Sequence, residues 1–209
     1  MLPLTPRPLT PRPLTSRPPT RRHIILAFAS AVTTLMMGTL MSDEAAAQPK
    51  LDLENTLYME LKNGRVVIQL FPDLAPKHVE RVKLLAREKF YDGTPFHRVI
   101  EGFMAQGGDP TGTGTSGSKY PDLPAEFTTK KHFLRGTVGA ARTASPNSAN
   151  SQFYIMFAPA SHLDGQYTIW GQVVSGMEAI DQIKRGSGGG GTVSNPDKIV
   201  TVRVAADVK

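Results

Sequence analysis

The sequence has no cysteine among its 209 residues, which excludes disulfides, thiolate metal ligands and a thiol nucleophile. It has a single tryptophan, and charged residues make up only 20% of the chain. Residues 48–209 hold 19 basic and 16 acidic residues, a balance too even to indicate nucleic-acid binding. Hydrophobic residues make up 40%, so the composition predicts an ordinary globular domain.

Motifs of metal, nucleotide and hydrolytic chemistry are missing or out of context. GTGTSG at 112–117 matches GxGxxG, but the SKYPDLP that follows cannot open the helix that a dinucleotide site requires. We interpret this segment and the glycine-rich residues 186–191 as flexible loops. No GxSxG elbow is present. We expect no metal site, because the histidines after residue 47 lack metal-ligand spacing: His78, His97, His132 and His162. We expect His78 on the exposed side of a helix.

Residues 1–47 have the composition of an export signal. A five-residue Pro-rich unit repeats over residues 3–17, and Arg21-Arg22 precedes a stretch, His23 to Ser42, without any Asp, Glu, Lys or Arg. Three alanines follow at 45–47. A positive region, an apolar region and a small-residue cleavage site predict a secretory signal and a periplasmic or secreted protein.

Alternatives stay open for this leader. The apolar run approaches the roughly 18–20 residues needed to span a bilayer, so an uncleaved inner-membrane anchor is one alternative. The adjacent arginines permit either the general or the twin-arginine export route. Residues 1–20 are also compatible with an over-extended gene start. We expect the folded domain to comprise residues 48–209.

The apolar patterns of that domain predict mostly strands. Residues 56–71 form two alternating runs around Asn63-Gly64, the strongest short hairpin signal. Helical spacing predicts helices over 75–91 and 176–186. Many short strands with two helices favour a barrel or sandwich over repeated βαβ units. The other expected strands lie within 96–109, 136–142, 151–157, 167–174 and 198–207.

Two polar side chains stand out in FHRVIEGFMAQGGD, residues 96–109. Arg98 and Gln106 lie among core-type apolar residues, although arginine is almost never fully buried unless it is paired. One interpretation is a structural ion pair between Arg98 and Glu101 or Asp109. The other is that both side chains line a functional groove. The pattern alone does not separate the two.

Three segments together resemble the cyclophilin family of peptidyl-prolyl cis-trans isomerases: residues 96–109, SANSQFYI at 148–155 and HLDGQYTIWGQVVSGM at 162–177. The likeness runs from about Asn55 to Val204 and is greatest to the bacterial secreted branch. It implies a mainly β fold, a closed eight-stranded antiparallel β-barrel capped by two α-helices. It also implies proline-containing polypeptides as partners, no cofactor and no nucleic acid. We expect a monomer that contacts a membrane only through an uncleaved N-terminal segment.

The resemblance assigns catalysis to Arg98 and Gln106. It assigns substrate binding to a larger set: Phe103, Met104, Ala141, Arg142, Gln152, Tyr154, His162, Leu163 and Tyr167. Four of these differ from the family's usual residues. Tyr154 replaces Phe, and Arg142, Tyr167 and His162 replace the Asn, His and Trp of its best-studied members. The Trp is associated with cyclosporin binding.

Arginine suits the chemistry that this resemblance implies. Rotation about an X-Pro bond frees the nitrogen lone pair, and a fixed donor aimed at that nitrogen stabilises the twisted state more than the planar one. The guanidinium is always charged and offers a rigid fork of donors. The alternative function is a non-catalytic module or chaperone that binds proline peptides in the same groove.

Overall fold

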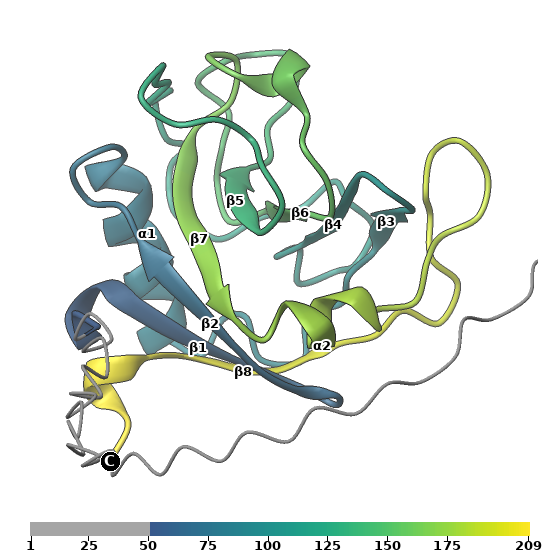
Figure 1. The fold of residues 1–209 in the computed structure, drawn as a ribbon, viewed down its shortest axis with the longest axis horizontal. Helices are drawn as coiled ribbons and strands as arrows, with labels where there is room; N and C mark the ends of the chain where they lie inside the picture. Colours follow the sequence, from purple (N-terminus) through teal and green to yellow (C-terminus); the bar gives the residue numbers. More distant parts are fainter. Residues whose placement is uncertain (1–50) are drawn as a thin grey trace, which may run out of the picture. The chain divides into compact units, whose positions relative to one another are not determined.

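The structure is a computed structural model that describes residues 51–209. The leader, export signal and anchor predicted within residues 1–47 therefore lie outside the described residues. Eight strands form one antiparallel sheet in the order β3-β4-β6-β5-β7-β2-β1-β8 (Figure 1). Their bounds are β1 Thr56–Leu61, β2 Gly64–Leu70, β3 Arg98–Ile100, β4 Met104–Gly107, β5 Thr137–Ala140, β6 Phe153–Met156, β7 Ile169–Ser175 and β8 Ile199–Val204.

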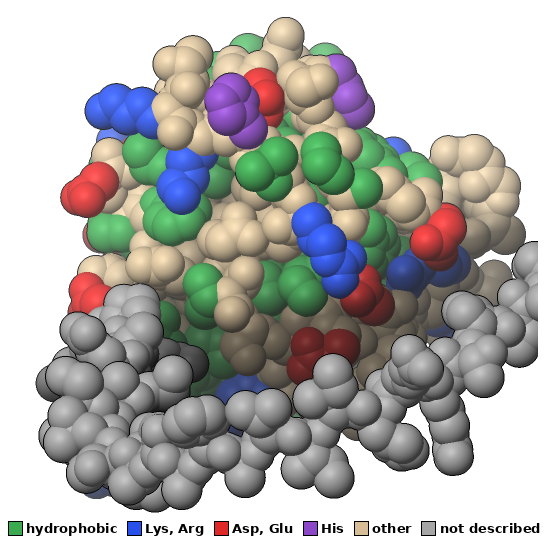
Figure 2. Space-filling view, viewed as in Figure 1, with side chains coloured by type: hydrophobic (Ala, Val, Ile, Leu, Met, Phe, Trp, Pro, Cys, Tyr) green, Lys and Arg blue, Asp and Glu red, His purple; other side chains and the backbone are tan. Residues whose placement is uncertain are grey.

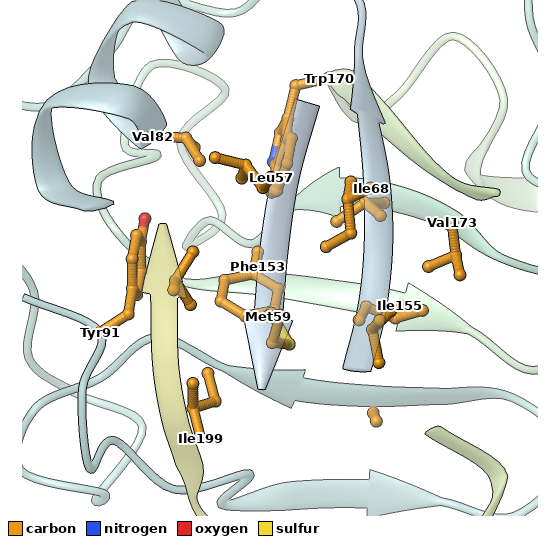
Figure 3. Packing of buried hydrophobic residues seen from close by; sticks show 14 of the residues in the cluster. Leu57, Met59, Ile68, Val82, Tyr91, Phe153, Ile155, Trp170, Val173 and Ile199 are labelled. Atoms are coloured by element: carbon orange, nitrogen blue, oxygen red, sulfur yellow. The ribbon is translucent and has the colours of Figure 1, made fainter. Parts of the chain in front are cut away.

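The predicted hairpin of residues 56–71 is confirmed as β1 and β2, which pair antiparallel from Thr56↔Gln69 to Leu61↔Gly64. Alternate residues of both strands point into one apolar core, where Leu57, Met59 and Ile68 are almost fully buried (Figure 3). Phe153 of β6 and Trp170 of β7 reach the same core, with ring centroids 6.0 Å apart. The sheet therefore curls around the side chains of its own inner face.

Both predicted helices are present and shorter than expected. α1 spans Pro76–Arg87 and α2 spans Met177–Asp181. α1 lies near β8 and α2 near β2 (Figure 1). α1 ends before Tyr91 because Lys89 adopts a φ of 58°, in the left-handed region that a helix cannot continue through. Three short 3-10 helices are η1 Leu53–Asn55, η2 Ser161–Leu163 and η3 Ala205–Asp207.

The prediction of a closed barrel is wrong in one respect: the sheet is a strongly curled half-barrel with edges at β3 and β8. Within residues 51–209 no ladder joins these two strands. The segment before β3 instead meets the start of β8 and the residues before it, through an isolated bridge at Pro95↔Lys198 and a hydrogen bond of 2.9 Å from Ile199 N to Thr94 O. The other edge of β3 is occupied by the loop of residues 186–192, through a bridge at Arg98↔Thr192 and a hydrogen bond of 2.7 Å from Val99 N to Gly191 O.

The expectation of an exposed His78 is also wrong. Its side chain is only 3% exposed, and its Nδ1 lies 2.6 Å from Oε2 of Glu126. Burial lowers the pKa of His78, although the Glu126 carboxylate acts against that shift. Helical spacing alone predicted too narrow a buried face for α1, because the loop that carries Glu126 covers the part of the helix where His78 lies.

The surface has no single-sign character on the face shown in Figure 2, where basic and acidic side chains are interspersed. That agrees with the even charge balance of residues 48–209. Among the described residues no helix is both long and apolar enough to cross a membrane. In the same residues, no group of three or more His, Cys, Asp or Glu side chains is arranged to hold a metal ion.

Candidate active site

The alternation of side chains along β3 and β4 determines on which face of the sheet Arg98 and Gln106 lie. Arg98 lies directly opposite Gln106 in the register of the two strands. Val99, the residue after Arg98 on β3, is fully buried on the core face. Because successive side chains of a strand point to opposite faces, Arg98 points to the other face of the sheet. A strand that is apolar on one side can thus present a guanidinium on the other.

Arg98 is held by two neutral acceptors. Its Nη1 donates to Oε1 of Gln106 at 3.1 Å, and its Nε donates to the carbonyl of Gly190 at 3.0 Å. Within residues 51–209, its Nη2 donates no hydrogen bond and the side chain has no carboxylate partner. These contacts orient the guanidinium and leave one of its nitrogen atoms available as a donor.

The interpretation of Arg98 as half of a structural ion pair is therefore wrong. Glu101 accepts a hydrogen bond from Nε of Arg185 at 2.7 Å. Asp109 accepts hydrogen bonds from the loop that follows it, including the backbone N–H of Gly114 at 2.6 Å. Both acidic candidates are engaged elsewhere.

A second amide continues the chain of hydrogen bonds away from Arg98. Nε2 of Gln106 donates to Oε1 of Gln152 at 3.0 Å. Nε2 of Gln152 in turn donates to the carbonyls of Gly114 and Ser116, at 3.1 and 2.8 Å. Because each amide has its acceptor and donor ends used, this chain fixes the side chain of Gln106 and hence one contact of Arg98.

Beside Arg98 lies a pocket of about 180 Å³. Its lining consists of nine residues, each of which belongs to the set assigned from the sequence: Arg98, Phe103, Met104, Gln106, Ala141, Arg142, Tyr154, Leu163 and Tyr167. The other two lie next to it. Gln152 lines a neighbouring cavity of about 300 Å³, and His162 stacks on Phe103 with ring centroids 5.7 Å apart.

The apolar wall of the pocket belongs to a cluster separate from the main core. Met104, Tyr154 and Leu163 are buried in it together with Phe133 and other residues. Phe103 is partly buried and packs against the same cluster. Strand register explains the arrangement, since β6 pairs with β4 on one side and β5 on the other, and the outer face of these strands carries the cluster.

Tyr154 fits over a glycine. A Cβ atom at Gly139 would lie 2.7 Å from the Tyr154 hydroxyl, so the ring requires the absence of a side chain there. The hydroxyl is buried and has no hydrogen-bond partner among the described residues. Burial raises the pKa of Tyr154 well above its usual value, and the phenol stays neutral. Tyr154 therefore serves the pocket as an apolar ring.

Arg142 and Tyr167 form the far wall. The Arg142 guanidinium lies 4.3 Å from the centroid of the Tyr167 ring. Its Nη1 donates to the carbonyls of Thr143 and Ala144, and its Nη2 to that of Gln166. Tyr167 also packs edge-on against Tyr154, with centroids 5.9 Å apart. The two unusual side chains thus support each other.

Two parts of this site were not found from the sequence. The loop of residues 110–118 is ordered by Asp109, whose carboxylate accepts hydrogen bonds from the backbone of Thr111, Gly114 and Ser116. Burial alone would raise the pKa of Asp109, but these hydrogen bonds outweigh it and lower the pKa to about 2. An Asp ahead of a Thr- and Gly-rich run is the signal that favours such an ordered turn. The other part is the Gly190 carbonyl, for which the sequence offers no signal.

The family model for "Cyclophilin type peptidyl-prolyl cis-trans isomerase/CLD" matches residues 56–204. A "Probable peptidyl-prolyl cis-trans isomerase" of Brucella suis is 52% identical over 193 residues, covering 87% of this chain and 95% of the relative. The rat "Peptidyl-prolyl cis-trans isomerase-like 3" is 40% identical over 127 residues, covering 58% of this chain and 77% of the relative.

Two crystal structures have the same fold. The cyclophilin AquaCyp293 of Hirschia baltica aligns with a TM-score of 0.68 at 26% identity, over 76% of this chain and 77% of that one. A cyclophilin-type isomerase of Cryptosporidium parvum, crystallised in the presence of the dipeptide Ala-Pro, aligns with a TM-score of 0.67 at 27% identity. It covers 71% of this chain and 98% of its own.

Proposed function

The chain belongs to the cyclophilin family and is a peptidyl-prolyl cis-trans isomerase, and from this premise we propose that Arg98 is its catalytic donor. The observation that carries the proposal is the geometry of Arg98. Two neutral acceptors fix the guanidinium at the rim of an apolar pocket, and one nitrogen has no partner among the described residues.

The reaction needs only a rotation about one bond. Partial double-bond character of the peptide bond sets a barrier of roughly 18–20 kcal/mol. At an X-Pro bond the uncatalysed exchange takes tens to hundreds of seconds. Lowering the barrier by about 7 kcal/mol would accelerate exchange about 10⁵-fold. No bond is broken, so the chemistry asks for a pocket and a donor, not a nucleophile.

Arg98 supplies the donor. When the bond twists, the prolyl nitrogen becomes pyramidal and able to accept a hydrogen bond, which it cannot do in the planar ground state. A donor already in place costs no reorganisation at that moment, so it stabilises the twisted state selectively. Gln106 is a positioning residue in this scheme, because it acts on the substrate through Arg98.

The apolar wall holds the proline ring. Phe103, Met104, Tyr154 and Leu163 offer aromatic and aliphatic surface in a pocket of about 180 Å³. We assign substrate binding to these residues and to the remaining members of the set: Ala141, Arg142, Gln152, His162 and Tyr167. Anchoring the ring lets the chain on the other side of the bond rotate.

We propose that the physiological substrates are proline-containing polypeptides that fold after export. The Ala-Pro dipeptide named with the Cryptosporidium parvum structure supports recognition of proline peptides. The composition of residues 1–47 supports a periplasmic or secreted monomer, with an inner-membrane anchor as the alternative. N-terminal sequencing of the exported protein tests this, since a start near Gln48 indicates cleavage.

A proline-limited refolding assay tests the assignment of Arg98. The wild-type protein accelerates the slow phase, and Arg98→Ala does so about 10²-fold less, the usual cost of removing one transition-state donor. Arg65→Ala is the control, because Arg65 lies on β2, outside the pocket, and pairs with Glu60. Equal acceleration by wild type and Arg98→Ala, with unchanged melting curves, would sink the role of Arg98.

A further inference from the structure

The pocket contains two arginines whose charge is not neutralised. Residues 51–209 include eight arginines, of which five form ion pairs with Asp or Glu: Arg65, Arg87, Arg135, Arg185 and Arg203. Of the other three, Arg98 and Arg142 line the pocket, and Arg81 lies on α1. No carboxylate lines the pocket itself. Two of the three described arginines without an ion pair therefore lie where the substrate binds.

Arg142 is a fixed cation. Carbonyl oxygens of Thr143 and Gln166 accept its hydrogen bonds, each at 2.9 Å, and the ring of Tyr167 lies 4.3 Å from its guanidinium carbon. Carbonyl dipoles and an aromatic face orient a guanidinium without cancelling its charge. Because the side chain is already held, a ligand that approaches it has little side-chain entropy to remove.

The position of Arg142 places this charge next to the proline. With Gln106 and Ala141 it lines both the apolar pocket and the neighbouring cavity of about 300 Å³. A peptide whose proline occupies the pocket therefore passes Arg142 with an adjacent residue. Asp122 lines the neighbouring cavity only, so an acidic side chain is favoured beside Arg142, which lines both cavities, and disfavoured beside Asp122.

We propose that Arg142 makes the enzyme favour substrates with an acidic residue directly next to the proline. The inference rests on the proposed function, in which Arg98 is reserved for the prolyl nitrogen and the apolar wall takes the ring. Arg142 is then the residue that recognises the side chain next to the proline. For partly exposed charge pairs, the expected preference is about two- to five-fold in kcat/KM.

Two series of short peptides test this inference, one varying the residue before proline and one the residue after it. Each series carries Glu, Gln or Lys at that position, and exchange rates are measured by NMR on the full-length protein. The wild type should turn over Glu peptides faster than Gln, and Gln faster than Lys, in at least one series. High salt should shrink the differences, because it screens partly exposed charges.

The ratio of the exchange rates of two peptides, measured with the same variant, is independent of any general loss of activity in that variant. In Arg142→Gln the Glu-to-Gln ratio should fall toward one, and in Arg142→Lys it should persist in part. Arg65→Gln is the matched control, because it removes the same charge from an arginine that also lies over a tyrosine ring, 4.6 Å from Tyr58, but outside the pocket. Its ratio should equal that of the wild type.

Two outcomes overturn the inference while the isomerase stands: equal rates for Glu, Gln and Lys peptides in an active wild type, or an unchanged ratio in Arg142→Gln. Failure of the proposed function looks different, since Arg98→Ala would then turn over every peptide as fast as the wild type does.

Discussion

Nη1 of Arg98 and Oε1 of Gln106 face each other across two neighbouring strands, joined by a hydrogen bond of 3.1 Å. The strand register sets this contact, and the Gln152 side chain behind it fixes which end of the Gln106 amide faces Arg98. An amide oxygen holds the guanidinium without neutralising it, whereas a carboxylate would compete with the substrate for its charge.

Gln106→Ala should lower kcat about ten-fold and change the KM for a proline peptide little. The variant removes a hydrogen bond to a charged group, of the kind worth about 1.5–3 kcal/mol. The apolar wall that binds the ring remains. Steady-state kinetics on one peptide, with Gln69→Ala on β2 as control, measure both constants. A rise in KM at constant kcat would contradict a positioning role and indicate that Gln106 binds the peptide itself.

Gly191→Ala should impair catalysis more than Gly189→Ala. Gly191 has a φ of 72°, and a Cβ there would lie 2.4 Å from Cγ1 of Ile100, so the variant pushes the loop away from β3. The carbonyl of Gly190 then leaves Nε of Arg98. Nothing lies within 4 Å of a Cβ at Gly189, which makes it the matched control.

The measurement for this pair is kcat together with the ¹⁵N chemical shift of Arg98 Nε. We expect a several-fold loss of kcat and a shifted resonance in Gly191→Ala alone. A shifted resonance with unchanged kcat would show that the Gly190 contact is dispensable.

The strands and both helices of the domain follow from the sequence because their signals are local. Alternating apolar residues and Asn63-Gly64 predict the first hairpin, and the structure confirms it. The set of site residues came from a resemblance that three segments carry, extended to Ala141 and Arg142 between the first two, and the structure brings nine of the eleven into one pocket. Their roles stay predictions.

What the sequence did not reveal depends on contacts between distant segments. Glu126 buries His78 from 48 residues away, and no helical pattern contains that information. Residues 186–191 were interpreted as a flexible connection, yet Gly191 O accepts from Val99 N at 2.7 Å and Gly186 N donates to Val99 O at 2.9 Å. Glycine composition allows a loop either to move or to lie flat against a strand edge.

Tyr154→Phe should stabilise the protein or leave it unchanged, and should preserve activity. The hydroxyl that it removes is buried without a partner, which costs about 1–3 kcal/mol where it occurs. Tyr91→Phe is the control, because the Tyr91 hydroxyl is buried and donates to the carbonyl of Ser151 at 3.3 Å. That variant should lose about 1 kcal/mol. Urea unfolding measures both; a Tyr154→Phe variant less stable than Tyr91→Phe would reveal a partner for the Tyr154 hydroxyl.

Asp109→Asn should destabilise the protein near neutral pH, by an amount that disappears in acid. The folded-state pKa of Asp109 is about 2, against an ordinary value of 3.8. Because the folded pKa is depressed, the carboxylate's contribution is fully present above pH 3.8 and is lost as pH falls through about 2. For this buried carboxylate, the contribution to the free energy of unfolding is about 2 kcal/mol.

Urea unfolding at a series of pH values from 7 down to 2 measures the difference between wild type and Asp109→Asn, with the exposed Asp73→Asn as control. The difference should hold from pH 7 to about 4 and then shrink. Activity should fall as well, because the loop that Asp109 orders supplies the carbonyls that hold Gln152, and through it Gln106. Equal stability of wild type and Asp109→Asn across the whole pH range would mean that the loop is held by the shape of the side chain at position 109, which Asn shares, and not by its charge.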